Sequence, residues 1–159
     1  MISTQKKNFE FNKNVLTLLT GTTVAQAIPV AISPILTRIY TPEDFGLFSI
    51  FIAITAIFGS TVNARYDLAI MLPKKDEDAI NLFALGFVIT TIISFCIFIL
   101  ILIFNENLVY YLGNKEIGIW LYFLPLTIFL TGIWNILSNF NNRKKKYKIL
   151  AKATILKSI

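Results

Sequence analysis

The chain has 159 residues, of which 55% are hydrophobic and 15% are charged, with 15 Lys and Arg residues against 9 Asp and Glu residues. A soluble domain has about 25% charged residues, so this composition and the mean hydropathy of +0.67 exclude an ordinary soluble globular protein. The sequence has no histidine, which excludes imidazole catalysis and the most common nitrogen ligand of metals. We expect an integral membrane protein with no soluble catalytic domain beside its spans.

Four runs without a charged residue, each at least 20 residues long, predict four membrane-spanning helices. The runs are residues 15–37, 45–64, 79–104 and 117–140. Residues 1–14 precede them, and residues 141–159 follow them. The expected fold class is therefore all-α, a polytopic bundle of transmembrane helices.

Signals for helix starts lie directly before three of these runs. Thr41 can cap a helix that begins at Pro42, and the nearby carboxylates of Glu43 and Asp44 favour the positive end of its dipole. The acidic residues 76–78 likewise favour the positive end of the dipole of the third helix. Asn114 is expected to cap the fourth helix.

Basic residues are concentrated in alternate loops. The N-terminal segment, residues 65–78 and residues 141–159 hold 13 of the 15 Lys and Arg residues, which leaves Arg38 and Lys115 for the opposite side. Cytoplasmic loops of membrane proteins are rich in Lys and Arg. We therefore expect both the N-terminus and the C-terminal segment in the cytoplasm.

The C-terminal segment, residues 141–159, is basic and amphipathic. Its lysines recur at four-residue spacing opposite apolar residues, the two sets being Lys144, Lys148, Lys152 and Ile149, Ala153, Leu156. This spacing predicts a helix in the cytoplasmic interface with its lysines toward anionic lipid head groups. An apolar stretch begins near Ile159, which we interpret as the start of a fifth span. Because no recognition motif accompanies the charge, we expect membrane lipids as partners and no nucleic acid.

Polar side chains on the first span form one arc. On a helix they lie within about 100°, beside Pro29 and Pro34, which predict a bend. The polar residues are Thr22, Thr23, Gln26, Ser33 and Thr37. Packing against another helix and lining a cavity are both open interpretations of this arc.

Two arginines end the first and second spans on opposite sides. Arg38 and Arg65 either anchor the spans at the interface or lie at the two mouths of a polar cavity, where they would attract an anionic substrate. The candidate substrate-binding or cavity-lining residues are Thr22, Gln26, Pro29, Ser33, Arg38 and Arg65.

Small and hydroxylated residues form stripes on two other spans. The members are Ser49, Ala53, Ala56, Ser60 and Asn63 on the second span, and Thr127, Thr131, Asn135 and Ser138 on the fourth. Such stripes favour close packing between helices.

Catalytic signatures are lacking in the sequence. We find no nucleophile–base pair, no cluster of metal ligands and no phosphate-cradling loop, so we expect no enzyme, no cofactor and no metal site. The four spans also contain no ionisable side chain, which does not favour a small ion-coupled exporter acting as a dimer. The single cysteine, Cys96, is expected to be a small apolar group.

Two passages carry a family resemblance. Residues 34–48, PILTRIYTPEDFGLF, and residues 64–73, ARYDLAIMLP, resemble the N-terminal region of bacterial polysaccharide biosynthesis proteins of the oligosaccharide flippase (Wzx-like) type. These flippases belong to the multidrug/oligosaccharidyl-lipid/polysaccharide exporter superfamily.

The resemblance implies a two-bundle transporter with a dozen or more helices and a cytoplasmic N-terminus. It would move undecaprenyl-pyrophosphate-linked oligosaccharide, a repeat unit of O-antigen or another polysaccharide, across the bacterial inner membrane by alternating access. With four spans and the start of a fifth, the chain is expected to be the N-terminal part of such a protein. The alternative is a complete four-helix accessory or assembly subunit without transport activity, with other polysaccharide assembly proteins as partners.

Overall fold

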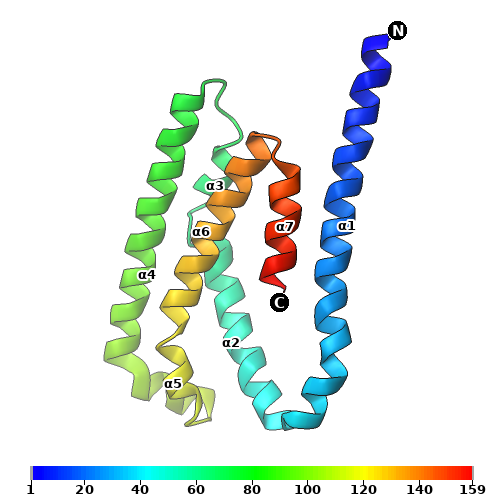
Figure 1. The fold of residues 1–159 in the computed structure, drawn as a ribbon. Helices are drawn as coiled ribbons and strands as arrows, with labels where there is room; N and C mark the ends of the chain where they lie inside the picture. Colours follow the sequence, from blue (N-terminus) through cyan, green and yellow to red (C-terminus); the bar gives the residue numbers. More distant parts are fainter. Residues whose placement is uncertain (1, 159) are drawn as a thin grey trace. The chain divides into compact units, whose positions relative to one another are not determined.

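The computed structural model describes the backbone of residues 2–158 and the side chains of residues 14–158. Within this part of the chain all regular structure is helical (Figure 1). The helices are α1 (Ile2–Ile39), α2 (Pro42–Thr61), α3 (Tyr66–Ala69), α4 (Asp76–Leu112), α5 (Ile117–Leu121), α6 (Leu124–Arg143) and α7 (Tyr147–Lys157). Four stretches are long and apolar enough to cross a membrane, namely Asn14–Ile39, Pro42–Thr61, Asp76–Leu112 and Ile117–Arg143. The predicted all-α polytopic fold is confirmed.

The start of α2 follows the predicted chemistry. The backbone N–H of Asp44 donates to Thr41 Oγ1 at 3.3 Å, and the Thr41 N–H donates to Asp44 Oδ2 at 2.8 Å, which completes a capping box. Asn114 acts differently from the prediction, because its Oδ1 accepts from the N–H of Glu116 at 2.8 Å and Glu116 is the cap of α5. This contact forms a local Asx turn before the helix.

Two helices differ from the charge-free runs that predicted them. Helix α4 continues past Phe104 to Leu112, because Asn and Glu do not break a helix, and it ends where Gly113 takes a left-handed φ of 71°. The fourth run is divided between α5 and α6. Pro125 has no N–H to donate to the carbonyl of Leu121, and its ring clashes with that carbonyl, so the helix is interrupted between these residues. By contrast, α1 continues through Pro29 and Pro34.

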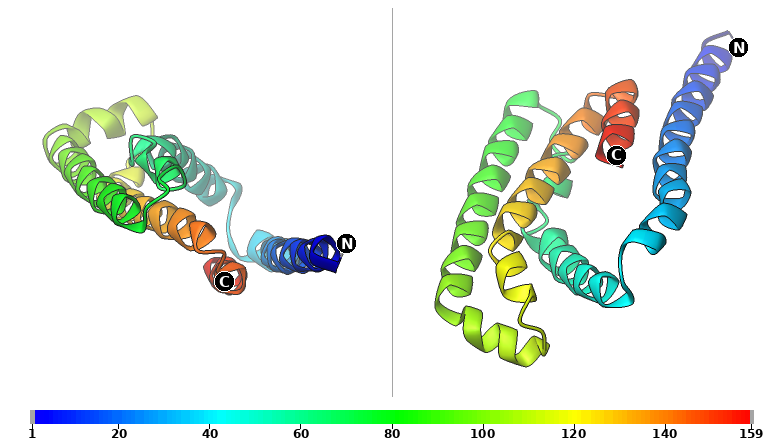
Figure 2. Two further views of the ribbon diagram at one scale, coloured as in Figure 1. Left: turned by 90° about the horizontal axis from the view of Figure 1, so that it is seen from above. Right: turned by 60° about the horizontal axis from the view of Figure 1, so that its bottom comes forward.

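The chain divides into two compact units, one with residues 1–40 and 141–159, the other with residues 41–140. In the first unit α7 packs along α1, and both helices run in the same direction (Figures 1 and 2). A Cβ added to Gly21 would lie 2.7 Å from the Cβ of Ala151, so the two backbones are very close there. Small residues permit this approach.

Helix α7 packs on α1 through a face other than the apolar face predicted for contact with the membrane interface. Ala151 is buried against α1, whereas Ile149 and Leu156 are exposed within the described residues. The reason is that close helix contact selects the smallest side chains on each helix and not the largest. The location of this segment at a membrane interface stays a prediction.

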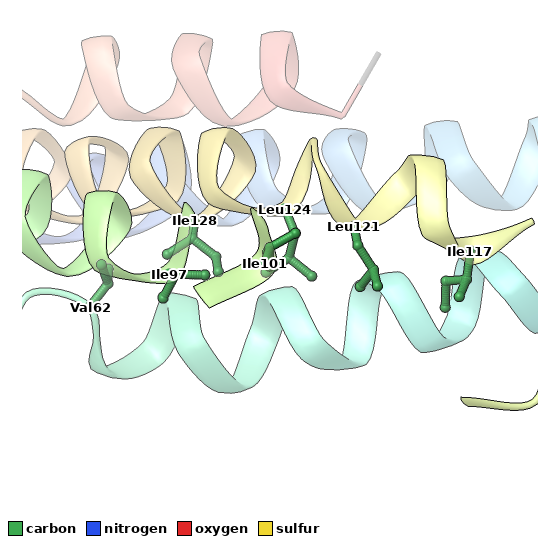
Figure 3. Packing of buried hydrophobic residues seen from close by; sticks show 7 residues of the cluster. All are labelled: Val62, Ile97, Ile101, Ile117, Leu121, Leu124 and Ile128. Atoms are coloured by element: carbon green, nitrogen blue, oxygen red, sulfur yellow. The ribbon is translucent and has the colours of Figure 1, made fainter. Parts of the chain in front are cut away.

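The second unit has an apolar core formed by residues of α4, α5 and α6 and by Val62, which follows α2 (Figure 3). Its buried members are Val62, Ile97, Ile101, Ile117, Leu121, Leu124 and Ile128. A smaller cluster of Ile70, Ala79 and Ile136 joins α3, α4 and α6, and the rings of Phe83 and Phe140 meet edge to face beside it with centroids 5.6 Å apart. These apolar clusters hold the helices together, and they therefore position the polar side chains of α2, α4 and α6 relative to one another.

Candidate functional site

Four of the five candidate residues of the first span lie on one side of α1. Gly21 and Ala25 are buried on the side of α1 that packs on α7, whereas the candidate residues are all exposed within the unit. The candidates on this helix are Thr22, Gln26, Pro29, Ser33 and Arg38. With about 100° per residue, the first four lie roughly 80–140° around the helix from Gly21, whereas Arg38, in the last turn, lies about 100° from Gly21 on the opposite side. The structure therefore keeps Thr22, Gln26, Pro29 and Ser33 together, away from α7.

The hydroxyl of Thr22 is satisfied by its own helix. Its Oγ1 donates to the carbonyl oxygens of Leu18 at 2.9 Å and Leu19 at 3.0 Å. Such back-bonding lets a threonine lie in an apolar helix without another partner, whereas the amide of Gln26 has more groups than its own helix can satisfy. Of the polar residues in this arc, Gln26 therefore most needs hydrogen-bond partners from outside its own helix.

Arg65 belongs to the second unit and lies in a strained turn. Ala64 and Arg65 have φ values of 48° and 63°, in the left-handed region that non-glycine residues avoid. The turn is held by the N–H of Ala64, which donates to Thr61 O at 2.7 Å, and by the N–H of Tyr66, which donates to Asn63 O at 2.9 Å. Arg65 itself is exposed. The turn therefore presents a cation outward while its neighbour Asn63 is buried.

Asn63 is the centre of a buried polar network. It is 2% exposed, and its side-chain Nδ2 donates to Thr90 Oγ1 at 2.7 Å and to Gly132 O at 3.1 Å. Thr90, also buried, donates in turn to Gly86 O at 2.7 Å. Both amide hydrogens and the threonine hydroxyl are therefore used. The network joins the end of α2 to α4 and α6.

Asn135 extends this network along α6. Its Nδ2 donates to Gly59 O at 3.2 Å and reaches Asn63 Oδ1 at 3.5 Å. One turn further along α6, Asn139 Nδ2 donates to Asp67 Oδ2 of α3 at 3.0 Å. Because each donor and acceptor is on a different helix, these bonds hold α2 and α3 against α6.

An open groove lies between α2 and α6, with a volume of about 400 Å³. It is lined by Phe48, Phe51, Ile52, Thr55, Ala56, Gly59, Ser60, Thr127, Thr131 and Asn135. The predicted stripes of the second and fourth spans meet here only in part, since Ser49 and Ala53 are exposed and do not line the groove. At the closest point a Cβ added to Gly59 would lie 2.9 Å from Thr131 Cγ2.

The chemistry of this unit is that of amides and hydroxyls. The groove contains no ionisable side chain, and the buried hydroxyl of Thr55 makes no hydrogen bond to any described residue. Such a surface can hold helices together or contact a neutral hydroxyl-bearing ligand, but it has no group for general acid–base work.

The sequence indicates some members of this network and not others. Asn63 and Asn135 belong to the packing stripes predicted from the sequence, whereas Thr90 and Asn139 do not. An asparagine in or beside a long apolar run is itself a signal, because an amide there needs partners. Thr90 offers no such signal, since a threonine can satisfy its hydroxyl on its own helix.

The family model described as "Polysaccharide biosynthesis protein" matches residues 35–159. No curated protein and no solved structure matches the chain significantly.

Proposed function

Since the chain belongs to the polysaccharide biosynthesis protein family, we propose that it forms the N-terminal helices of a carrier that moves lipid-linked oligosaccharide across the bacterial inner membrane. The substrate class is an undecaprenyl-pyrophosphate-linked repeat unit of lipopolysaccharide or another polysaccharide. Both the N-terminus and the C-terminal segment lie in the cytoplasm. The carrier acts by binding and by alternating access, without a catalytic group or a cofactor. The family and the four apolar helices support a membrane protein of polysaccharide synthesis.

A carrier for this substrate must protect polar groups from hydrocarbon. Each hydroxyl or amide moved into an apolar medium without a hydrogen-bond partner costs about 2–7 kcal/mol, and a pyrophosphate costs far more. A helix that borders the path of the glycan is therefore expected to present polar side chains away from lipid.

The polar arc of α1 is the observation that supports the carrier most directly. Thr22, Gln26 and Ser33 are exposed on a face that does not pack on α7. In contact with lipid the amide of Gln26 would lack partners, so in the assembled carrier this face borders protein or a water-filled cavity. Arg38 and Arg65, both exposed at helix ends, would attract the pyrophosphate.

Cysteine labelling tests whether this face borders an aqueous path. Cys96, which is exposed on α4, is first replaced by alanine. Gln26→Cys is then compared with Val24→Cys, a control at nearly the same depth on α1, because two residues span about 3 Å along the helix and about 160° around it. In whole cells a membrane-impermeant maleimide is expected to label Gln26→Cys at least tenfold faster than Val24→Cys.

The dependence on substrate separates the carrier from an accessory subunit. If the arc borders the glycan path, labelling of Gln26→Cys increases when glycan assembly is blocked at its first sugar-phosphate transfer. Equal labelling of both cysteines, independent of glycan assembly, contradicts the carrier. In that case, discrete cross-linked adducts from Ser60→Cys, on the groove between α2 and α6, would support the four-helix assembly subunit.

A further inference from the structure

The six residues that lead from the end of α2 to the buried Ile70, residues 64–69, are here called the strap. They include the short helix α3, which lies beside α6 (Figure 1). Both flanks of the strap are fixed in the interior, because Asn63 and Ile70 are almost completely buried. None of the six residues between them is buried. The strap is therefore held by its flanks and by hydrogen bonds, without a buried side chain of its own.

The strap begins with a type I′ turn that contains no glycine. The N–H of Tyr66 donates to Asn63 O at 2.9 Å across the turn, and the two central residues, Ala64 and Arg65, have φ values of 48° and 63°. Both central positions of this turn type need a positive φ and usually hold Asn, Asp or Gly. The backbone at Ala64 and Arg65 is therefore strained, and a right-handed conformation would release that strain.

The second half of the strap is tied to α6 through a carboxylate. Asn139 Nδ2 donates to Asp67 Oδ2 at 3.0 Å, and both side chains are partly buried. Hydrogen bonds to an ionised carboxylate are stronger than those between neutral groups. Tyr66, whose N–H closes the turn, is also the first residue of α3, so a bond that holds α3 on α6 also holds the turn. The strain of the turn and the bond between Asp67 and Asn139 therefore act in opposite directions on one short segment.

We propose that the strap is a conformational switch and that the bond between Asp67 and Asn139 is its latch. In the closed state, which is the one in the structure, the latch offsets the strain at Ala64 and Arg65. In the open state the bond is broken, the turn relaxes to a right-handed backbone and α3 leaves α6, while the flanks of the strap stay in place. Because opening changes the backbone of Arg65 itself, the switch moves the cation at the end of α2. This inference is independent of the carrier activity proposed above.

Hydrogen exchange of single amides tests the switch, and it is followed by nuclear magnetic resonance on the purified full chain in detergent micelles. Two amides report on the strap, because the Tyr66 N–H donates to Asn63 O and the Leu68 N–H donates to Arg65 O in the closed state. If the strap opens as one unit, the two protection factors agree within about threefold, and both are at least about tenfold lower than that of the buried Thr90. A larger difference between the two, or protection equal to that of Thr90, overturns the proposal.

Asn139→Ala removes the donor of the latch. Loss of a hydrogen bond to a carboxylate should speed exchange of both strap amides at least about tenfold and leave that of Thr90 unchanged. Asp67→Asn is the conservative variant, because its side-chain oxygen can still accept from Asn139, and it should speed exchange less than about threefold. Asn107→Ala, at an exposed position of α4, is the control and should change neither rate. The latch is overturned if Asn139→Ala exchanges like Asn107→Ala, or if Asp67→Asn has as large an effect as Asn139→Ala.

A pair of glycines separates relief of strain from misfolding. In Ala64→Gly/Arg65→Gly both central residues adopt the left-handed conformation without strain, so the closed state is favoured and exchange of the strap amides should slow at least about fivefold. Added to Asn139→Ala, the pair should reverse the faster exchange of that variant. Glycines that relieve no strain would only make the backbone more flexible and speed exchange. Unchanged or faster exchange on adding the pair, with or without Asn139→Ala, therefore overturns the proposal.

Discussion

Replacing Asn63 by alanine removes the amide that joins α2 to two other helices. The side chain is 2% exposed and donates to Thr90 Oγ1 at 2.7 Å on α4 and to Gly132 O at 3.1 Å on α6. Its Oδ1 also lies 3.5 Å from Asn135 Nδ2. Thr90 keeps its bond to Gly86 O, and Asn135 keeps its bond to Gly59 O, so the change leaves few groups without a partner.

The expected magnitude follows from the number of bonds lost. A hydrogen bond between membrane helices contributes about 0.6 kcal/mol on average and up to about 1.7 kcal/mol. Two bonds are lost in Asn63→Ala, and we expect the free energy of unfolding to fall by about 1–3 kcal/mol. The change should be measured by equilibrium unfolding with dodecyl sulfate in mixed lipid–detergent micelles, followed by circular dichroism.

A double-mutant cycle with Thr90→Val isolates the bond between the two side chains. The coupling energy is expected to be about 0.5–1.5 kcal/mol. Asn107→Ala, at an exposed position of α4, is the control and should change stability by less than about 0.5 kcal/mol. A coupling energy of zero, with Asn63→Ala no more destabilising than Asn107→Ala, would refute the network as a tie between helices.

Three further substitutions, with Gly46→Ala as a control, test the close contacts of two glycines and the left-handed conformation of Lys145. Gly132→Ala places a Cβ 2.5 Å from Thr90 Cγ2 and 2.9 Å from Val62 Cγ1, and it should lower the unfolding free energy by about 1–3 kcal/mol. Gly46→Ala meets nothing within 4 Å and should not lower stability, and equal effects of the two would contradict the packing. Gly21→Val places its Cβ 2.7 Å from Ala151 Cβ and is expected to speed hydrogen exchange of α7 amides at least tenfold, whereas unchanged exchange would count against the contact between α1 and α7. Lys145→Gly, at a φ of 54°, should raise thermal stability by about 1 kcal/mol, and a loss of stability would contradict the left-handed turn.

The existence of the helices could be predicted from the sequence, but not all of their ends. Charge-free runs predict spans because hydrocarbon excludes charged groups, yet charge marks where an apolar stretch ends and not where a helix ends. Helix α4 therefore continues through Asn105 and Glu106 to the stop at Gly113. Pro125 interrupts the fourth run, whereas Pro29 and Pro34 do not interrupt α1, and that outcome depends on the packing around each proline.

The candidate site was predictable where it lies on one helix. The polar arc of α1 follows from helical periodicity alone, and the structure keeps its residues on one face. The network around Asn63 joins residues 27 and 69 positions apart, and no local pattern pairs residues at such separations. The contact of Gly21 with Ala151 was likewise not predictable. The lysine spacing predicts an apolar face of α7, and a different face of α7 packs on α1.

The transport of lipid-linked oligosaccharide is tested most directly by its distribution between the two leaflets of the inner membrane. In cells from which the gene has been deleted, the lipid-linked repeat unit should accumulate in a form protected from a glycan-modifying enzyme added to spheroplasts. Restoring the gene should make it accessible again, and restoring it with Gln26→Ala should do so more slowly. If the accessible fraction is the same with and without the gene, the carrier function is contradicted.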